Sequence, residues 1–147
     1  MSETILCDTS FVSVLQRGGS LSEWPTAVRD RLSNATLAMS VISLAELRDG
    51  HIYAGWGSAR RARAEQLMAS YLWVPLDMAI VDEWARMRAD CRRRGVKVPH
   101  NDIWIAASAT TRGWPLVSCD RDFDALAAVD HIRLDVPGAL PAPPQQA

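Results

Sequence analysis

Residues 3–11, ETILCDTSF, join a short apolar run to an acid and then to two hydroxyl residues. The apolar run predicts a buried strand, and the residues from 10 to 19 continue with a helical pattern. A carboxylate at the end of a buried strand points into the crevice where open α/β sheets bind ligands. This stretch therefore predicts an α/β fold with Asp8 at the edge of a ligand crevice.

Three more acids stand where an apolar run ends or a helical pattern begins. Glu46 follows the buried-looking stretch AMSVIS, Asp102 opens the segment DIWIAASA, and Asp120 closes PLVSCD. Four carboxylates brought into one crevice would repel one another, and a divalent cation is the usual means of holding them together. Asp8, Glu46, Asp102 and Asp120 therefore indicate metal-dependent chemistry on phosphates.

Strand-like runs alternate with segments of helical period along the chain. This alternation predicts a compact α/β/α sandwich, in which helices cover both faces of a mostly parallel sheet. We expect one domain over residues 1–136 and a Pro-rich tail over 137–147. The predicted strands are 3–8, 36–41, 73–77, 115–120 and 131–136, and the predicted helices are 10–19, 22–35, 43–56, 58–73, 78–94, 102–113 and 122–128.

Local signals predict several helix ends and one core face. Ser22, Asp77 and Asn101 precede helical patterns and are predicted to cap them. Gly95 is expected to stop the longest helix. That helix presents one apolar face at helical spacing, made of Ile80, Trp84, Met87 and Cys91.

Composition excludes several classes of protein. The chain has 147 residues, 48% of them hydrophobic and 22% charged. A chain of this length can bury a hydrophobic core without disulfides. The sequence contains no apolar run long enough to cross a membrane and no signal-peptide pattern at its start, so we expect a cytoplasmic protein. Three cysteines without metal-ligand spacing are expected to be reduced.

Each acid also has a purely structural explanation. Asp8 is a good helix N-cap, and Glu46 could complete a capping box with Ser43. Asp102 lies at a helix start, where the dipole stabilises an anion by about 0.3–1 kcal/mol. Asp120 is harder to explain in this way, because two further acids follow it within four residues.

The order of the acids distinguishes these explanations. The segments ILCDTSF, SVISLAELRDG, HNDIWIAASA and LVSCDRDFDAL resemble the four acidic motifs of PIN-domain ribonucleases, and most of all those of VapC toxins. The resemblance extends from about residue 5 to residue 136. It implies that Asp8, Glu46, Asp102 and Asp120 bind the metal and are the catalytic residues. Asp122 would either support these ligands without binding the metal itself or cap a helix. It also implies that Ser118 hydrogen-bonds a ligand carboxylate.

The same resemblance implies an activity and partners. The expected function is a Mg²⁺-dependent endoribonuclease toxin of a type II toxin–antitoxin system, and Mn²⁺ would suit the same oxygen ligands. A metal-activated water would cleave single-stranded RNA and leave a 3′-hydroxyl and a 5′-phosphate. The implied partners are the RNA substrate, a second copy in a homodimer, and a VapB-type antitoxin in a heteromeric complex. Tyr53 and Trp56 are predicted to line the antitoxin groove.

Other functions stay open at this point. A catalytically inactive PIN-fold module that binds RNA or protein is the alternative, although the presence of all four acids disfavours it. A haloacid-dehalogenase-type phosphatase would need the motif Asp-x-Asp, whereas this chain has Asp8-Thr9-Ser10 at that place. His100 is the histidine nearest to an acidic motif, and we expect it to lie in a loop. Two groups of cations are candidates for phosphate contacts or simple solvated surface: Arg60, Arg61 and Arg63, and Arg92, Arg93, Arg94 and Lys97.

Overall fold

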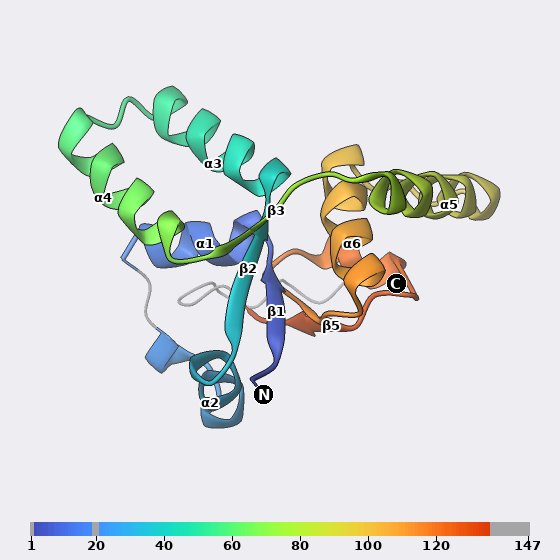
Figure 1. Cartoon of the computed structure of the whole chain (residues 1–147), viewed down its shortest axis with the longest axis horizontal. Helices are drawn as coiled ribbons and strands as arrows, with labels where there is room; N and C mark the ends of the chain where they lie inside the picture. Colours follow the sequence, from blue (N-terminus) through green and yellow to red (C-terminus); the bar gives the residue numbers. More distant parts are fainter. Residues whose placement is uncertain (1, 19–20, 136–147) are drawn as a thin grey trace, which may run out of the picture.

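The computed structural model describes residues 2–18 and 21–135, and in this part of the chain five strands form one sheet (Figure 1). All neighbouring strands are parallel, in the order β3-β2-β1-β4-β5. The strands are β1 (Thr4–Cys7), β2 (Thr36–Ser40), β3 (Leu72–Val74), β4 (Leu116–Ser118) and β5 (His131–Arg133). The predicted parallel α/β sheet is therefore confirmed.

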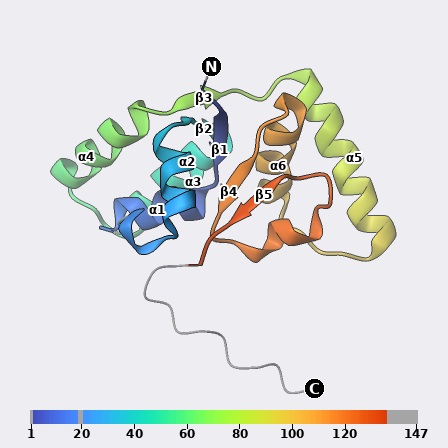
Figure 2. The same cartoon turned by 90° about the horizontal axis from the view of Figure 1, so that it is seen from below.

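Helices cover both faces of this sheet. In Figure 2, α1 and α2 lie on one side of the strands, and α5 and α6 lie on the other. The helices are α1 (Thr9–Gln16), α2 (Thr26–Ser33), α3 (Val41–Tyr53), α4 (Ser58–Ala69), α5 (Met78–Arg94) and α6 (His100–Arg112), with short 3₁₀ helices η1 (Leu21–Glu23) and η2 (Arg121–Ala125). The architecture is the predicted α/β/α sandwich.

The strands bury side chains on both faces in alternation. In β1, Ile5 and Cys7 join the core on the side of α1, whereas Leu6 joins the core on the side of α6. Val117 and Leu116 of β4 divide in the same way. Successive side chains of a strand point to opposite faces, so a sheet covered on both sides needs near-continuous apolar runs such as ILC and PLV.

The chain order places a topological switch point between β1 and β4. From β1 the chain adds β2 and then β3 on one side, and it returns to place β4 on the other side. Ligands of open α/β sheets bind at such a switch point, beyond the carboxyl ends of the strands. Asp8 directly follows β1, and Asp120 lies two residues beyond the end of β4.

Several predicted boundaries are wrong because proline and strand pairing override the local pattern. Ser22 lies in η1, and the helix begins only at Thr26 after Pro25. Residues before a proline are disfavoured in helical geometry, which explains the break. The helix predicted to end at residue 73 ends at Ala69, because Leu72–Val74 pairs with β2.

The signals on the longest helix are confirmed. Asp77 caps α5 by accepting a hydrogen bond from the backbone N–H of Ile80, with 2.9 Å between nitrogen and oxygen. Gly95 ends the helix with a φ of 67°, a left-handed conformation that suits glycine. Ile80, Met87 and Cys91 are buried and Trp84 packs against the same core. The tail predicted for 137–147 lies outside the described residues.

None of the helices in the described part of the chain has the length and apolarity needed to cross a membrane.

Candidate metal centre

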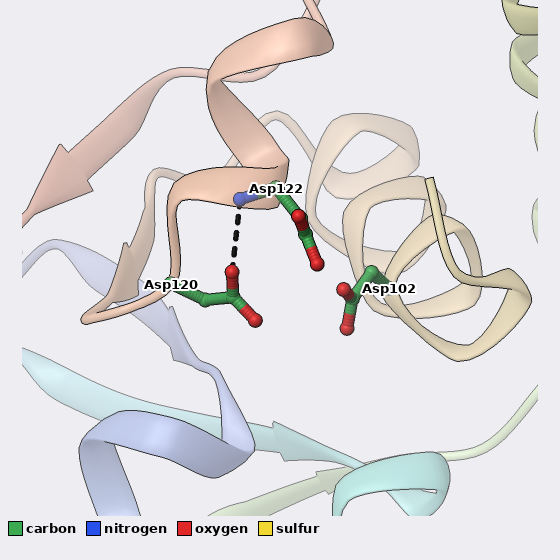
Figure 3. Close-up of side chains that lie close together, drawn as sticks. All are labelled: Asp102, Asp120 and Asp122. Atoms are coloured by element: carbon green, nitrogen blue, oxygen red, sulfur yellow. Dashed lines mark hydrogen bonds between the residues drawn. The ribbon is translucent and has the colours of Figure 1, made fainter. Parts of the chain in front are cut away.

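Three carboxylates meet at the carboxyl end of β4 (Figure 3). Asp102 comes from the first turn of α6, and Asp120 and Asp122 come from the start of η2. One oxygen of each carboxylate lies within 4.8 Å of the others. Residues far apart in the sequence thus form a group of three acids with the spacing of a cation site.

Local hydrogen bonds fix the turn that carries two of these acids. Asp120 is the N-cap of η2, and its side chain accepts from the backbone N–H of Asp122 at 2.9 Å. The backbone N–H of Asp120 donates to Ser118 Oγ at 2.8 Å. Asp120 therefore caps a helix and faces the centre at the same time. Asp122 is not a cap, so that alternative for Asp122 is wrong.

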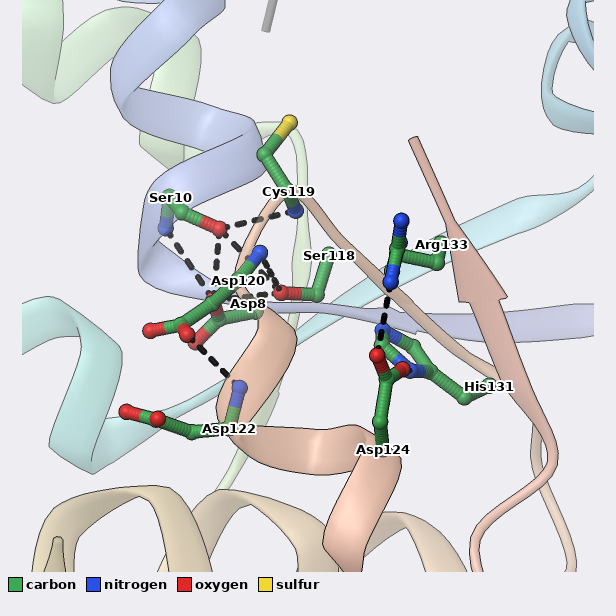
Figure 4. Close-up of polar contacts among 9 residues, drawn as sticks. All are labelled: Asp8, Ser10, Ser118, Cys119, Asp120, Asp122, Asp124, His131 and Arg133. Carbon is green, nitrogen blue, oxygen red and sulfur yellow. Dashed lines mark hydrogen bonds and ion pairs between the residues drawn. The ribbon is translucent and has the colours of Figure 1, made fainter. Parts of the chain in front are cut away.

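Asp8 lies beside this group at the end of β1, and its side chain is only 3% exposed. As predicted, it caps α1, accepting from the Ser10 backbone N–H at 3.3 Å. The hydroxyls of Ser10 and Ser118 also donate to Asp8 Oδ2, at 2.7 and 3.0 Å (Figure 4). The hydrogen bond predicted for Ser118 is confirmed.

Ser10 ties the first strand–helix unit to the last one. Its hydroxyl accepts from the backbone N–H of Cys119 at 3.0 Å and lies 3.2 Å from Ser118 Oγ. Sequence reasoning recognised Ser10 only as a hydroxyl beside Asp8. The missing information was spatial, because Ser118 and Cys119 lie more than 100 residues away from Ser10 along the chain.

Glu46 lies outside the group of three, and its capping-box explanation is wrong. Helix α3 begins at Val41 with Ser40 as its N-cap, so Ser43 lies inside the helix. Glu46 Oε1 instead accepts from Thr9 Oγ1 at 2.6 Å. The hydrogen bond joins α3 to α1 next to Asp8, which keeps Glu46 at the side of the centre.

Asp102 carries the clearest electrostatic signature. Burial, together with the charges of Asp8 and Asp120 and the hydrogen bond and charge of Asp122, raises its pKa to about 8. Burial also raises the pKa of Asp8, although hydrogen bonds from Ser10 and Ser118 act in the opposite direction. The folded chain therefore holds negative charges together at a cost, which a cation would relieve.

The residues present fit a hard divalent cation. The group contains carboxylate oxygens and no histidine or cysteine, the donor set that suits Mg²⁺ or Mn²⁺ rather than a structural Zn²⁺. Asp102, Asp120 and Asp122 are the residues that could share one ion, with Asp8 adjacent. The raised pKa of Asp102 reflects its burial first and the negative charge of its neighbours second, and a bound cation would offset both.

We expect the stabilising effect of Mg²⁺ to grow with pH. Asp102 holds its proton up to about pH 8 in the folded chain, but only up to about pH 4 when unfolded. The folded state thus binds more protons in this window, and without a cation its stability falls as pH rises. Thermal unfolding at about pH 5.5 and about pH 8 should show the larger Mg²⁺-induced rise in Tm at the higher pH. Equal rises would contradict the expectation, and Asp102→Asn should reduce the difference.

The structure corrects two predictions at the start of α6 and adds contacts for Trp56. His100 is the first residue of α6 rather than a loop residue, and its ring packs edge-on against Trp84. Asn101 lies within the first turn of α6, so it is not the N-cap. Trp56, predicted to line the antitoxin groove, stacks on His51 with 4.3 Å between ring centroids, and the Arg60 guanidinium lies 3.7 Å from the Trp56 centroid.

Comparison with known proteins agrees with the fold. A family model described as PIN domain matches residues 5–129, and the chain therefore belongs to the PIN-domain family. Within the family, the chain is 36% identical over 132 residues to Ribonuclease VapC5 of Mycobacterium tuberculosis, covering 86% of this chain and 93% of that protein. It is 33% identical over 107 residues to Ribonuclease VapC4 of the same organism, covering 71% and 82%.

Two solved structures share the fold of this chain. VapBC-5 from Mycobacterium tuberculosis, a member of the VapBC family of toxin–antitoxin systems, superposes with a TM-score of 0.68 at 31% identity, over 89% of this chain and 98% of that chain. VapBC2 from Rickettsia felis, bound to a DNA fragment from its promoter, gives a TM-score of 0.79 over 90% and 99%, but at 17% identity it supports the fold alone. The similarity of this chain is thus to the VapC members of the family.

Proposed function

We propose that this chain is a metal-dependent endoribonuclease and the toxin of a type II toxin–antitoxin pair. The observation that carries the proposal is the meeting of Asp102, Asp120 and Asp122 beside the buried Asp8. The relatives named Ribonuclease VapC5 and Ribonuclease VapC4 support RNA as the substrate. A binding module without catalysis would not need to keep carboxylates packed at this electrostatic cost.

The acids have distinct proposed parts. Asp102 and Asp120 would hold the cation, and Asp122 is well placed to share it. Asp8 and Glu46 would add negative charge beside the cation. The hydroxyls of Ser10 and Ser118 donate hydrogen bonds to Asp8, and the hydroxyl of Thr9 donates one to Glu46. When bound, Mg²⁺ or Mn²⁺ would lower the pKa of a water and offset the charge of the phosphodiester.

The proposed reaction is hydrolysis of single-stranded RNA that leaves a 3′-hydroxyl and a 5′-phosphate. Carboxylates repel a phosphodiester, so the same residues that hold the cation keep the substrate away when no cation is present. No protein nucleophile is required. His51 and His100 are both engaged in ring contacts, and neither belongs to the acidic group.

The test is cleavage of an end-labelled single-stranded RNA by the purified chain. We expect cleavage in Mg²⁺, loss of cleavage in EDTA, and recovery when Mg²⁺ is added in excess, because the acids cannot act on the phosphate without a cation. The matching duplex RNA serves as the substrate control. Cleavage that persists in EDTA would contradict the proposed metal dependence, and absence of cleavage in Mg²⁺ would favour the inactive binding module.

A VapB-type antitoxin is the proposed protein partner, as the names of the VapBC neighbours suggest. The end of α3 exposes two large apolar side chains, with Ile52 65% and Tyr53 93% accessible. Their position beside Trp56, on the helix that carries Glu46, supports the end of α3 as part of the antitoxin surface. The antitoxin and the homodimer remain proposals for this chain.

We expect Tyr53→Ala to weaken antitoxin binding by about tenfold or more, because a central aromatic contact typically contributes over ~1 kcal/mol. Met78→Ala is the matched control, since Met78 is 71% exposed on α5 instead of α3. Titration of the toxin with its antitoxin measures both. Unchanged affinity for Tyr53→Ala would exclude the end of α3 from the interface.

A further inference from the structure

A cavity of about 380 Å³ lies next to the acidic centre. Thr9 and Glu46 line it on the side of the centre, and His51 and Trp56 line it farther along α3. Its volume falls within the range of about 300–1,000 Å³ that small-molecule sites occupy. The cavity therefore adjoins the place where the grouped carboxylates would hold a substrate phosphate through a cation, because Glu46 lies beside that group and lines the cavity.

The part of the cavity lined by His51 and Trp56 is preorganised. His51 is buried, stacks on Trp56, and lies 2.7 Å through Nε2 from Gln16 Oε1. Burial lowers the pKa of His51, so the ring is neutral near pH 7 and its Nε2–H can donate to Gln16. A side chain held by both stacking and a hydrogen bond offers a fixed surface to a ligand.

The polar groups of the cavity suit a nucleobase better than a phosphate. Two carboxylates line it, Glu46 and Asp49, and both would repel a phosphate. Within the described residues, the carboxylate of Asp49 has no ion pair or hydrogen bond, and neither has the guanidinium of Arg17, the cation in the lining. A free carboxylate accepts hydrogen bonds from base N–H groups, and an arginine donates to base oxygen or nitrogen atoms.

We propose that this cavity binds one base of the RNA next to the cleaved bond, and that Asp49 favours a base with N–H donors. The inference rests on the proposed nuclease function and adds a specificity site to it. Proteins commonly recognise single-stranded RNA by accepting splayed-out bases and hydrogen-bonding their edges. Cleavage at the acidic centre would not depend on the identity of the base. The base bound in the cavity would decide which phosphodiester bond lies at that centre.

Gly50 offers a way to close the cavity without disturbing the helix. It lines the cavity, and a Cβ added there would have no atom within 4 Å outside its own helix. Gly50→Leu should therefore fill the space, and Ala85→Leu, at an exposed residue of α5 outside the cavity, is its matched control. Asp49→Asn removes the charge at nearly constant shape. Asp82→Asn, at an exposed residue of α5, is the matched control for that change.

The experiment digests a randomised single-stranded RNA pool in Mg²⁺ and sequences the new ends. For the wild type we expect a base preference at one position beside the cut. Asp49→Asn should reduce that preference by about tenfold, the lower range for a lost base contact. Gly50→Leu should remove the preference and slow cleavage, and both controls should retain the wild-type profile.

The outcomes separate this inference from the proposed function. If the wild type does not cleave RNA at all, the nuclease proposal itself fails. If it cleaves and Asp49→Asn and Gly50→Leu keep the wild-type base profile, the nuclease stands and the base site is overturned. A change in antitoxin affinity alone, with an unchanged base profile, would assign the cavity to a peptide and equally overturn the base site.

Discussion

Asp102→Asn is expected to lower the rate of RNA cleavage by about a thousandfold while the protein stays folded. Asp102 is 8% exposed and supplies one of the three grouped carboxylates. Loss of a ligand charge removes several kcal/mol of electrostatic stabilisation, and each ~1.4 kcal/mol corresponds to a tenfold change in rate. Asparagine keeps the shape of the side chain, so the loss should come from charge alone.

Stability makes the Asp102→Asn result diagnostic. The raised pKa of Asp102 means that its ionised form costs folding free energy at about pH 8. Without Mg²⁺, the variant should therefore be at least as stable as the wild type at that pH. Urea unfolding measures this, and a strongly destabilised variant would show that Asp102 serves the fold rather than a cation.

Asp124→Asn is the matched control for Asp102→Asn. Asp124 lies in the same 3₁₀ helix as Asp122, but it is exposed and pairs with Arg133 and His131 away from the centre (Figure 4). Surface ion pairs contribute about 0–1 kcal/mol, so both stability and cleavage should stay close to the wild type. If Asp124→Asn abolished cleavage as fully as Asp102→Asn, the effect would not be specific to the grouped acids.

Phe123→Ala is expected to destabilise the protein by about 3–5 kcal/mol. Phe123 is fully buried and lies between Asp122 and Asp124 in η2. Its ring belongs to the core formed with α5 and α6, and it meets His131 at 5.6 Å between centroids. Removal would leave a cavity beneath the turn that carries Asp120 and Asp122.

Phe123→Leu tests the same position with less loss of volume. A swap that largely conserves volume usually costs under about 1.5 kcal/mol, so this variant should fold and keep most of its activity. Urea denaturation of the two variants gives the free energies of unfolding. If Phe123→Ala lost less than about 1 kcal/mol, η2 would not depend on this anchor, and the support proposed for the acids would be wrong.

Local pattern was enough to predict the layers of this fold. ILC and PLV are apolar at every position because both faces of β1 and β4 are covered, and such runs can be recognised without knowing their partners. The ends of α5 were predictable for the same reason, since Asp77 and Gly95 act through their own backbone neighbours. Local pattern failed at the end of α4, because Leu72–Val74 pairs with the distant strand β2 instead of continuing the helix.

The sequence by itself placed Asp8, Asp102 and Asp120 at strand ends or helix starts, because those positions depend on short-range signals. Only the tertiary structure decided how the acids are grouped. It brought Asp122 to Asp102 and Asp120, and it left Glu46 to the side, bound to Thr9. The physical reason is that distances between side chains across the crevice depend on how β1, β4 and α6 pack, which no single segment specifies. The same packing created the cavity beside Glu46, which no motif indicated.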